Sequence, residues 1–116
     1  MAYRSEVAIR CQDKAYEMFE KAWGELTPDK IFHQKDDHLI YWDYVKWYED
    51  YPDVSAIENV MSKLNELDND EAIEKKMGYR FMRLGEDDTD IETEGNTYDI
   101  GLWMIRKIDL SDFEGK

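Results

Sequence analysis

The chain has little cysteine, no long apolar run and little positive charge, and each shortage excludes a class of protein. Cys11 is the only cysteine among 116 residues, so no disulfide can form within the chain. This composition fits a reducing compartment. No stretch of about 18 apolar residues is present, as a transmembrane helix would require. The first residues lack the basic and then apolar order of a signal peptide, so we expect a cytoplasmic protein.

The shortage of positive charge gives a formal net charge of −13, and the imbalance lies in one part of the chain. Residues 1–35 carry six basic and six acidic residues, whereas residues 36–116 carry nine basic and twenty-two acidic residues. Direct binding of nucleic acid needs a positive surface for the phosphates, and docking on an anionic membrane needs the same. We therefore expect neither. A basic protein surface is the partner that electrostatics favour.

The chain has enough hydrophobic residues to form one core. Hydrophobic residues make up 42% of the chain and aromatic residues 14%, which is typical of a folded chain and not of a disordered one. Its length fits a single domain. We expect this domain to span residues 1–110, with a frayed tail at 111–116.

Apolar spacing predicts a mixture of strands and helices. Alternation predicts strands at 3–11, 31–35, 38–48, 79–84 and 98–108. Helical spacing predicts helices at 13–26 and 53–67, capped by Gln12-Asp13 and Asp53, and one further turn at 71–77. This order predicts an α+β fold with an antiparallel or mixed sheet of four to five strands and two helices on one face.

The strand at 38–48 is unusually aromatic. Leu39, Tyr41, Val45 and Trp47 alternate with Ile40, Trp42 and Tyr44. Because both faces are apolar or aromatic, we expect this strand inside the sheet and not at its edge. Burial under the helices is the simpler interpretation of the aromatic side chains. The alternative is that some of them anchor a partner, because Trp and Tyr are favoured at interfaces.

A polar segment follows the strand at 79–84 and is rich in carboxylates. Its acidic residues, within fourteen positions that hold no Lys or Arg, are Glu86, Asp87, Asp88, Asp90, Glu92, Glu94 and Asp99. We expect residues 86–97 to form a solvated loop that projects from an antiparallel hairpin of 79–84 with 98–108. An EF-hand would need Gly at its sixth position, where counting from Asp88 gives Thr93, so the calcium pattern fails.

The same segment has a third interpretation, imitation of a nucleic-acid backbone. Carboxylates at alternate positions of an extended chain lie about 6–7 Å apart, and duplex DNA carries a phosphate every ~3.4 Å on each strand. Two further acidic clusters accompany the segment. They are Asp36, Asp37, Asp43, Glu49, Asp50 and Asp53 in one case, and Glu66, Asp68, Asp70, Glu71 and Glu74 in the other.

Signals of catalysis are weak. No G-x-S-x-G, P-loop, G-x-G-x-x-G or H-E-x-x-H pattern occurs. His33 and His38 flank Asp36 and Asp37, but their spacing matches no strong zinc pattern, and a turn between strands explains the acidic pair better. Cys11 is best explained as a core or edge thiol. We therefore expect no enzyme, no cofactor and no metal site.

Three stretches resemble small acidic proteins of bacteriophages and prophages that have no established activity. They are Tyr3-Arg4-Ser5-Glu6-Val7-Ala8, Tyr41-Trp42-Asp43-Tyr44-Val45-Lys46-Trp47-Tyr48 and Arg83-Leu84-Gly85-Glu86-Asp87-Asp88. The resemblance implies a context, because such phage proteins are often inhibitors of host defence, anti-CRISPR proteins included. It implies no catalytic residues.

The sequence thus leads to two hypotheses. The first is a non-enzymatic, phage-encoded inhibitor that binds a basic, nucleic-acid-binding host protein in the host cytoplasm, with DNA-like electrostatics. The residues expected at its partner surface are Glu86, Asp87, Asp88, Asp90, Glu92, Glu94, Trp42, Tyr44, Glu49 and Asp50. The alternative is a domain that binds a small ligand or metal, calcium or a nucleotide, or a minor enzyme, with Arg80 and Arg83 lining a pocket.

Overall fold

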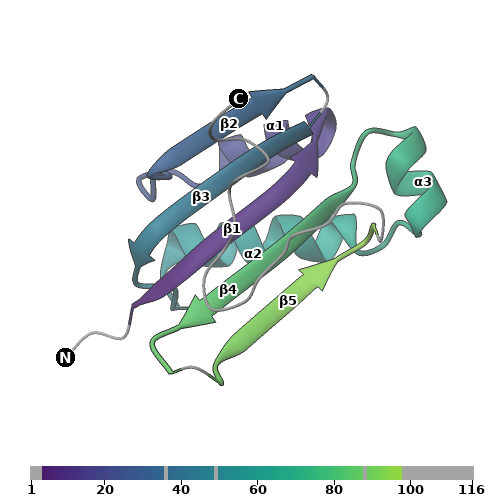
Figure 1. Ribbon diagram of the computed structural model, residues 1–116. Helices are drawn as coiled ribbons and strands as arrows, with labels where there is room; N and C mark the ends of the chain where they lie inside the picture. The colour runs from purple at the N-terminus through teal and green to yellow at the C-terminus, as the bar shows by residue number, and fades with distance from the viewer. Residues whose placement is uncertain (1–3, 36, 49, 88, 98–116) are drawn as a thin grey trace.

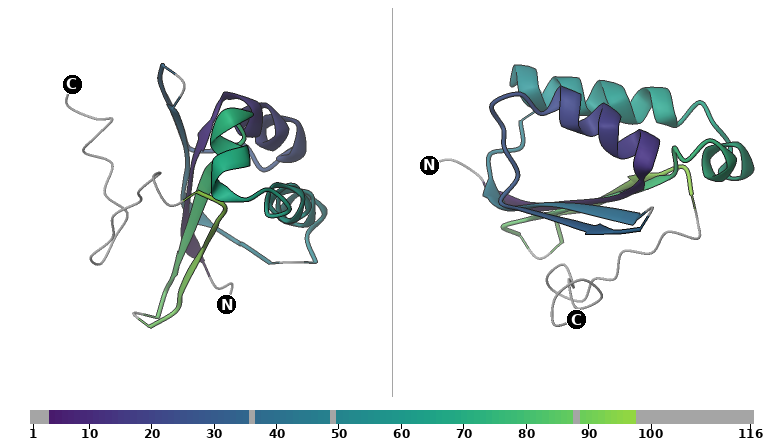
Figure 2. Two further views of the ribbon diagram at one scale, coloured as in Figure 1. Left: turned by 90° about the vertical axis from the view of Figure 1, so that its right-hand side faces the viewer. Right: turned by 90° about the horizontal axis from the view of Figure 1, so that it is seen from above.

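The computed structural model describes residues 4–35, 37–48, 50–87 and 89–97. Within them an antiparallel sheet of five strands runs in the order β2-β3-β1-β4-β5, and α1 and α2 cover one face of it (Figures 1 and 2). The elements are β1 (Ser5–Gln12), α1 (Asp13–Ala22), β2 (Lys30–Gln34), β3 (Asp37–Val45), α2 (Pro52–Leu64), α3 (Asn69–Glu74), β4 (Tyr79–Gly85) and β5 (Ile91–Gly95). The predicted α+β class, with two helices on one face of the sheet, is confirmed.

Strand β1 lies at the centre of the sheet and organises it. It pairs with β3 on one side and with β4 on the other, both antiparallel. Its odd positions Val7, Ile9 and Cys11 face the helices, and the even position Ala8 is also fully buried. A strand buried on both faces needs small or apolar side chains at successive positions, which this one supplies.

The core lies mainly between the sheet and the two long helices. Phe19 of α1 and Ile57 and Met61 of α2 pack against Ile40, Trp42 and Phe81 of the sheet. A smaller cluster on the opposite face consists of Ala8, Leu39, Tyr41 and Met82. Both faces of β3 are therefore buried, and β3 lies inside the sheet between β2 and β1, as predicted.

Helix boundaries differ from the predicted ones in ways that the structure explains. Helix α1 ends at Ala22 and not near 26, because Gly24 adopts a left-handed backbone conformation (φ 53°) that ends the helical path. Helix α2 begins with Pro52, so Asp53 lies in the first turn and not at the cap. The Asp53 carboxylate instead accepts a hydrogen bond from the backbone N–H of Glu25, at 3.2 Å.

The predicted pairing at the C-terminal side of the sheet is wrong. Strand β4 pairs along one edge with β1 and along the other with β5, from Leu84 opposite Ile91 to Arg80 opposite Gly95. Five of the twelve residues of the predicted loop therefore form a strand, and both edges of β4 are paired with other described strands. The predicted strand at 98–108 and the predicted tail at 111–116 lie outside the described residues.

Candidate partner-binding surface

A β-bulge near the end of β3 turns Tyr44 away from the core. Between β1 and β3 the register shifts: Val7 lies opposite Trp42, but Ser5 lies opposite Val45, so β3 has one extra residue. An extra residue reverses which face the following side chains point to. Val45 consequently joins Trp42 in the core and Tyr44 is 66% exposed. The predicted alternation, with Val45 beside Leu39 and Tyr41, is wrong for this reason.

Arg4 brings two predicted groups of partner residues together. Its guanidinium carbon lies 5.2 Å from the centre of the Tyr44 ring, within the range of a cation–π contact. Its backbone N–H donates a hydrogen bond to the Glu86 carboxylate. Tyr44 and Glu86 are far apart in sequence, but they flank the start of β1. We call the surface formed by Arg4, Tyr44, Glu86, Asp87 and Ile91 the hairpin-end surface.

Three large exposed side chains come from elements that begin or end at this end of the sheet. Tyr44, Ile91 and Tyr51 are 66%, 49% and 40% exposed. Ile91 begins β5 just after the β4–β5 turn, and Tyr51 precedes α2, whose start lies at the same end as the end of β3 (Figures 1 and 2). Large apolar side chains rimmed by charged residues are typical of protein interaction sites.

The carboxylates of the predicted loop have partners, which the sequence analysis did not expect. Arg83 of β4 donates from Nε to Glu92, at 2.9 Å, and from Nη2 to Asp90, at 2.8 Å. It also donates from Nη1 to the Ser5 hydroxyl, at 3.0 Å. Burial lowers the pKa of Arg83, but the hydrogen bonds to Asp90 and Glu92 outweigh it and raise that pKa overall. The prediction of a projecting, solvated loop is therefore wrong.

Asp87 closes the β4–β5 turn. Its carboxylate accepts hydrogen bonds from the backbone N–H of Thr89, at 2.9 Å, and from the Thr89 hydroxyl, at 2.8 Å. The two hydrogen bonds from Thr89 lower the pKa of Asp87. Asp87 thus stays charged and exposed at the tip of the hairpin, beside Glu86.

The other predicted partner residues are scattered. Trp42 is 1% exposed and its indole N–H donates to the carbonyl of Leu26, at 3.0 Å, so we correct the expectation that it contacts a partner. Asp50 is exposed after β3. Glu94 points to the helix layer, where it accepts from Asn65 at 2.7 Å. Glu49 and Asp88 lie outside the described residues.

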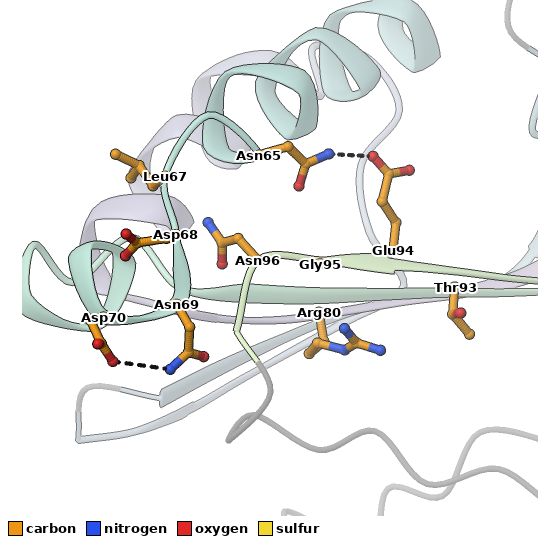
Figure 3. Close-up of a pocket in the computed structure, with 10 residues that line it drawn as sticks. All are labelled: Asn65, Leu67, Asp68, Asn69, Asp70, Arg80, Thr93, Glu94, Gly95 and Asn96. Atoms are coloured by element: carbon orange, nitrogen blue, oxygen red, sulfur yellow. Dashed lines mark hydrogen bonds between the residues drawn. The ribbon is translucent and has the colours of Figure 1, made fainter.

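A second region, which the sequence analysis did not single out as a site, lies at the opposite end of β4 and β5. An open cleft of about 790 Å³ runs between the α2–α3 connection and the end of β5 (Figure 3). We call it the α3 cleft. Its lining residues are Asn65, Leu67, Asp68, Asn69, Asp70, Arg80, Thr93, Glu94, Gly95 and Asn96. Gly95 is required here, because a Cβ at this position would lie 2.5 Å from the Tyr79 carbonyl oxygen.

Most polar groups of the α3 cleft serve the fold. The Asn96 amide donates to the Leu64 carbonyl, at 2.8 Å, and its oxygen accepts from the backbone N–H of Tyr79, at 3.0 Å. Asp68 caps α3 by accepting from the N–H of Glu71, at 2.8 Å. Arg80 has no ion-pair partner among the described residues and points away from Asn65 and Asp68 (Figure 3). Arg83 does not line the cleft, contrary to expectation.

Candidate metal ligands and Cys11 lie in the part of the chain that the structure describes. No group of three His, Cys, Asp or Glu side chains there is arranged to hold a metal ion. Cys11 is fully buried, and burial, with Asp37 and Asp13 nearby, raises the pKa of its thiol. A thiol held protonated is a poor nucleophile. No described helix is long and apolar enough to cross a membrane.

Comparison with protein-family models, curated proteins and solved structures finds no match to this chain.

Proposed function

We propose that this chain is a non-enzymatic binding protein that engages a basic protein surface through the hairpin-end surface. One observation carries the proposal: the bulge in β3 exposes Tyr44 beside the charged tip of the β4–β5 hairpin. Bulges often re-aim a side chain for use, and a rigid aromatic side chain next to carboxylates suits a partner rich in Arg and Lys. The net charge of −13 adds long-range attraction.

Within this proposal the chain is an inhibitor of a host nucleic-acid-binding protein, of the kind found among small acidic phage proteins. The carboxylates of Glu86 and Asp87 would occupy the place of backbone phosphates on the target. Such binding weakens with added salt, because exposed charges are screened. It also competes with duplex DNA for the same basic surface.

The first test maps the surface with a defined probe. Isotope-labelled protein is titrated with a nona-arginine peptide at low and moderate salt, and backbone amide shifts are recorded. Shifts are expected around Tyr44, Glu86 and Asp87, with weaker binding at the higher salt concentration. The double variant Glu86→Gln/Asp87→Asn, and separately Tyr44→Ser, should weaken binding. The matched control is Glu66→Gln/Glu74→Gln, which also removes two negative charges, but at the α3 end of the molecule.

Equal losses in the two double variants would mean that net charge alone binds the peptide, and the proposal would fail. The inhibitor hypothesis needs a further result. A protein captured from bacterial lysate by the wild type and by the control variant, but not by Tyr44→Ser, should be displaced by a short DNA duplex. A captured protein that DNA does not displace would refute DNA-like binding.

A second candidate function is a small-ligand site in the α3 cleft. Its volume lies in the range of small-molecule sites, and Arg80 offers a cation without a counterion among the described residues. A nucleotide or another small anion is the ligand class that such a cation favours. Thermal shift against nucleotides, calcium and zinc tests it, because a ligand that binds the native state raises the melting temperature. A shift that survives Arg80→Met would place the ligand elsewhere.

A further inference from the structure

Three side chains from three elements form a hydrogen-bonded chain at the β2 edge of the sheet. His38 Nε2 of β3 is hydrogen-bonded to Asp13 Oδ1 at the start of α1. His38 Nδ1 lies 2.7 Å from His33 Nδ1 of β2, its cross-strand neighbour. The Tyr16 ring of α1 packs against both imidazoles, with centroid distances of 5.2 Å to His33 and 4.8 Å to His38.

The positions of the protons follow from the partners. An ionised carboxylate only accepts, so His38 Nε2 carries a proton. A hydrogen bond between two Nδ1 atoms needs one proton between them: one atom donates and the other keeps its lone pair. The His33–His38 pair can share one proton in this way when both imidazoles are neutral, or when only one of them is charged. A pair with two charges has a proton on each Nδ1, so the contact becomes a repulsion between two cations.

Among the described residues, Asp13 is the carboxylate that is hydrogen-bonded to the pair. Asp37 of β3 lies on the other face of the sheet and is engaged by Arg10, with Nε and Oδ2 2.9 Å apart. Cys11, opposite His38 on β1, is a neutral thiol. The further titratable and charged groups nearby are Tyr16 and Glu20 on α1 and Lys35 in the β2–β3 turn.

We propose that the His33–His38 pair is a proton-sensitive latch that holds β2 on β3 at neutral pH and releases it when both imidazoles are charged. Strand β2 is short and largely exposed, and in the described sheet it pairs with β3 alone, so a change in one cross-strand contact has a measurable effect on its opening. Imidazoles take up protons between about pH 5 and 8. The edge of β3 is thus exposed for strand pairing more often under acidic conditions than at neutral pH.

Hydrogen exchange followed by NMR tests the latch residue by residue. Protection factors, which correct for the intrinsic pH dependence of exchange, are measured at pH 7.5 and pH 5 for the amides that join β2 and β3. The wild type should lose about fivefold in protection at pH 5, the factor that matches one net hydrogen bond of about 1 kcal/mol. Amides that join β1 and β4 serve as the internal control and should change by less than about twofold.

Two variants make the result decisive. His33→Gln keeps a polar side chain that stays neutral at both pH values, so its β2 protection should be the same at pH 7.5 and pH 5. His33→Asn provides a second neutral side chain if the first variant perturbs the strand. Loss of β2 protection at pH 5 that persists in both variants would overturn the proposal, as would unchanged protection in the wild type. Loss that also spreads to β1 and β4 would show global acid unfolding and would equally overturn it.

Discussion

At the two acid-rich ends of the β4–β5 pair, the carboxylates differ in whether they have structural partners. Beyond the β4–β5 turn, Asp90 and Glu92 share Arg83. Around α3, Asp68 caps the helix, whereas Glu66 and Glu74 are exposed and have no partner among the described residues. The first group is part of the fold, and the second contributes mainly charge.

The difference shows that a run of acidic residues does not reveal which carboxylates are free. The segment with no Lys or Arg of its own contains two ion-paired carboxylates, because the cation that pairs with them lies on the neighbouring strand. At the hairpin-end surface the exposed side chains that Arg83 does not engage are Tyr44, Glu86 and Asp87, and the two carboxylates accept hydrogen bonds from Arg4 and Thr89 instead.

The largest expected effect is that of removing the shared cation. Arg83→Met should lower the free energy of unfolding by about 2 kcal/mol, because four hydrogen bonds, three of them to carboxylate oxygens, are lost. The matched control is Arg80→Met, three residues earlier on the same strand, which should change stability by less than about 0.5 kcal/mol. Urea denaturation measures both. Equal effects would contradict the distinction between the two arginines.

The second-largest effect on stability is expected from neutralising the carboxylates that pair with Arg83. Asp90→Asn/Glu92→Gln should cost about 1 kcal/mol, because these side chains are partly exposed and their ion pairs are weakened by solvent. A solvated loop would instead be unaffected or slightly stabilised by the change. Denaturation at low and high salt separates the two, since only an ion pair loses its contribution as salt rises. A stabilised double variant would restore the loop interpretation.

Alkaline pH probes two phenols of the sheet, those of Tyr79 and Tyr41. Burial raises the pKa of Tyr79, whose hydroxyl donates to Asn65 at 2.7 Å, and burial with the Glu6 contact raises that of Tyr41. The folded chain thus holds these protons more tightly than the unfolded chain does. The contribution of the two phenols to the free energy of unfolding is complete below about pH 10, and it is lost as the pH rises above that value.

Stability measured between pH 9 and pH 11 should fall, and it should fall less in Tyr79→Phe and in Tyr41→Phe. A full wild-type slope in both variants would contradict the assignment of this fall to the two phenols.

The smallest effect is expected at α3. Glu66→Gln/Glu74→Gln should leave the free energy of unfolding unchanged or raise it by a few tenths of a kcal/mol, because like charges are removed without loss of a described partner. Thermal denaturation at low salt measures this best. A loss of 1 kcal/mol or more would show that these carboxylates also have structural partners, and the contrast between the two ends would disappear.

Much of the fold was predictable from local spacing. The alternation of Val7, Ile9 and Cys11 predicted β1, and the spacing of Ile57, Met61 and Leu64 predicted α2, because burial of one face imposes a period on the sequence. The candidate site was predictable only in part. Tyr44 was among the predicted partner residues, yet so was Trp42, which is buried in the core.

The sequence by itself determined the α+β class, the net charge and the absence of a disulfide, since these depend on composition and short-range periodicity. The tertiary structure decided which aromatic side chains are exposed and which carboxylates are paired. One extra residue in β3 reverses the face of the sheet to which the following side chains point. The position of this bulge depends on the pairing of β3 with β1. The pairing of Arg83 with Asp90 and Glu92 depends likewise on the register between β4 and β5, because a carboxylate is neutralised by its neighbour in space and not by its neighbour in sequence.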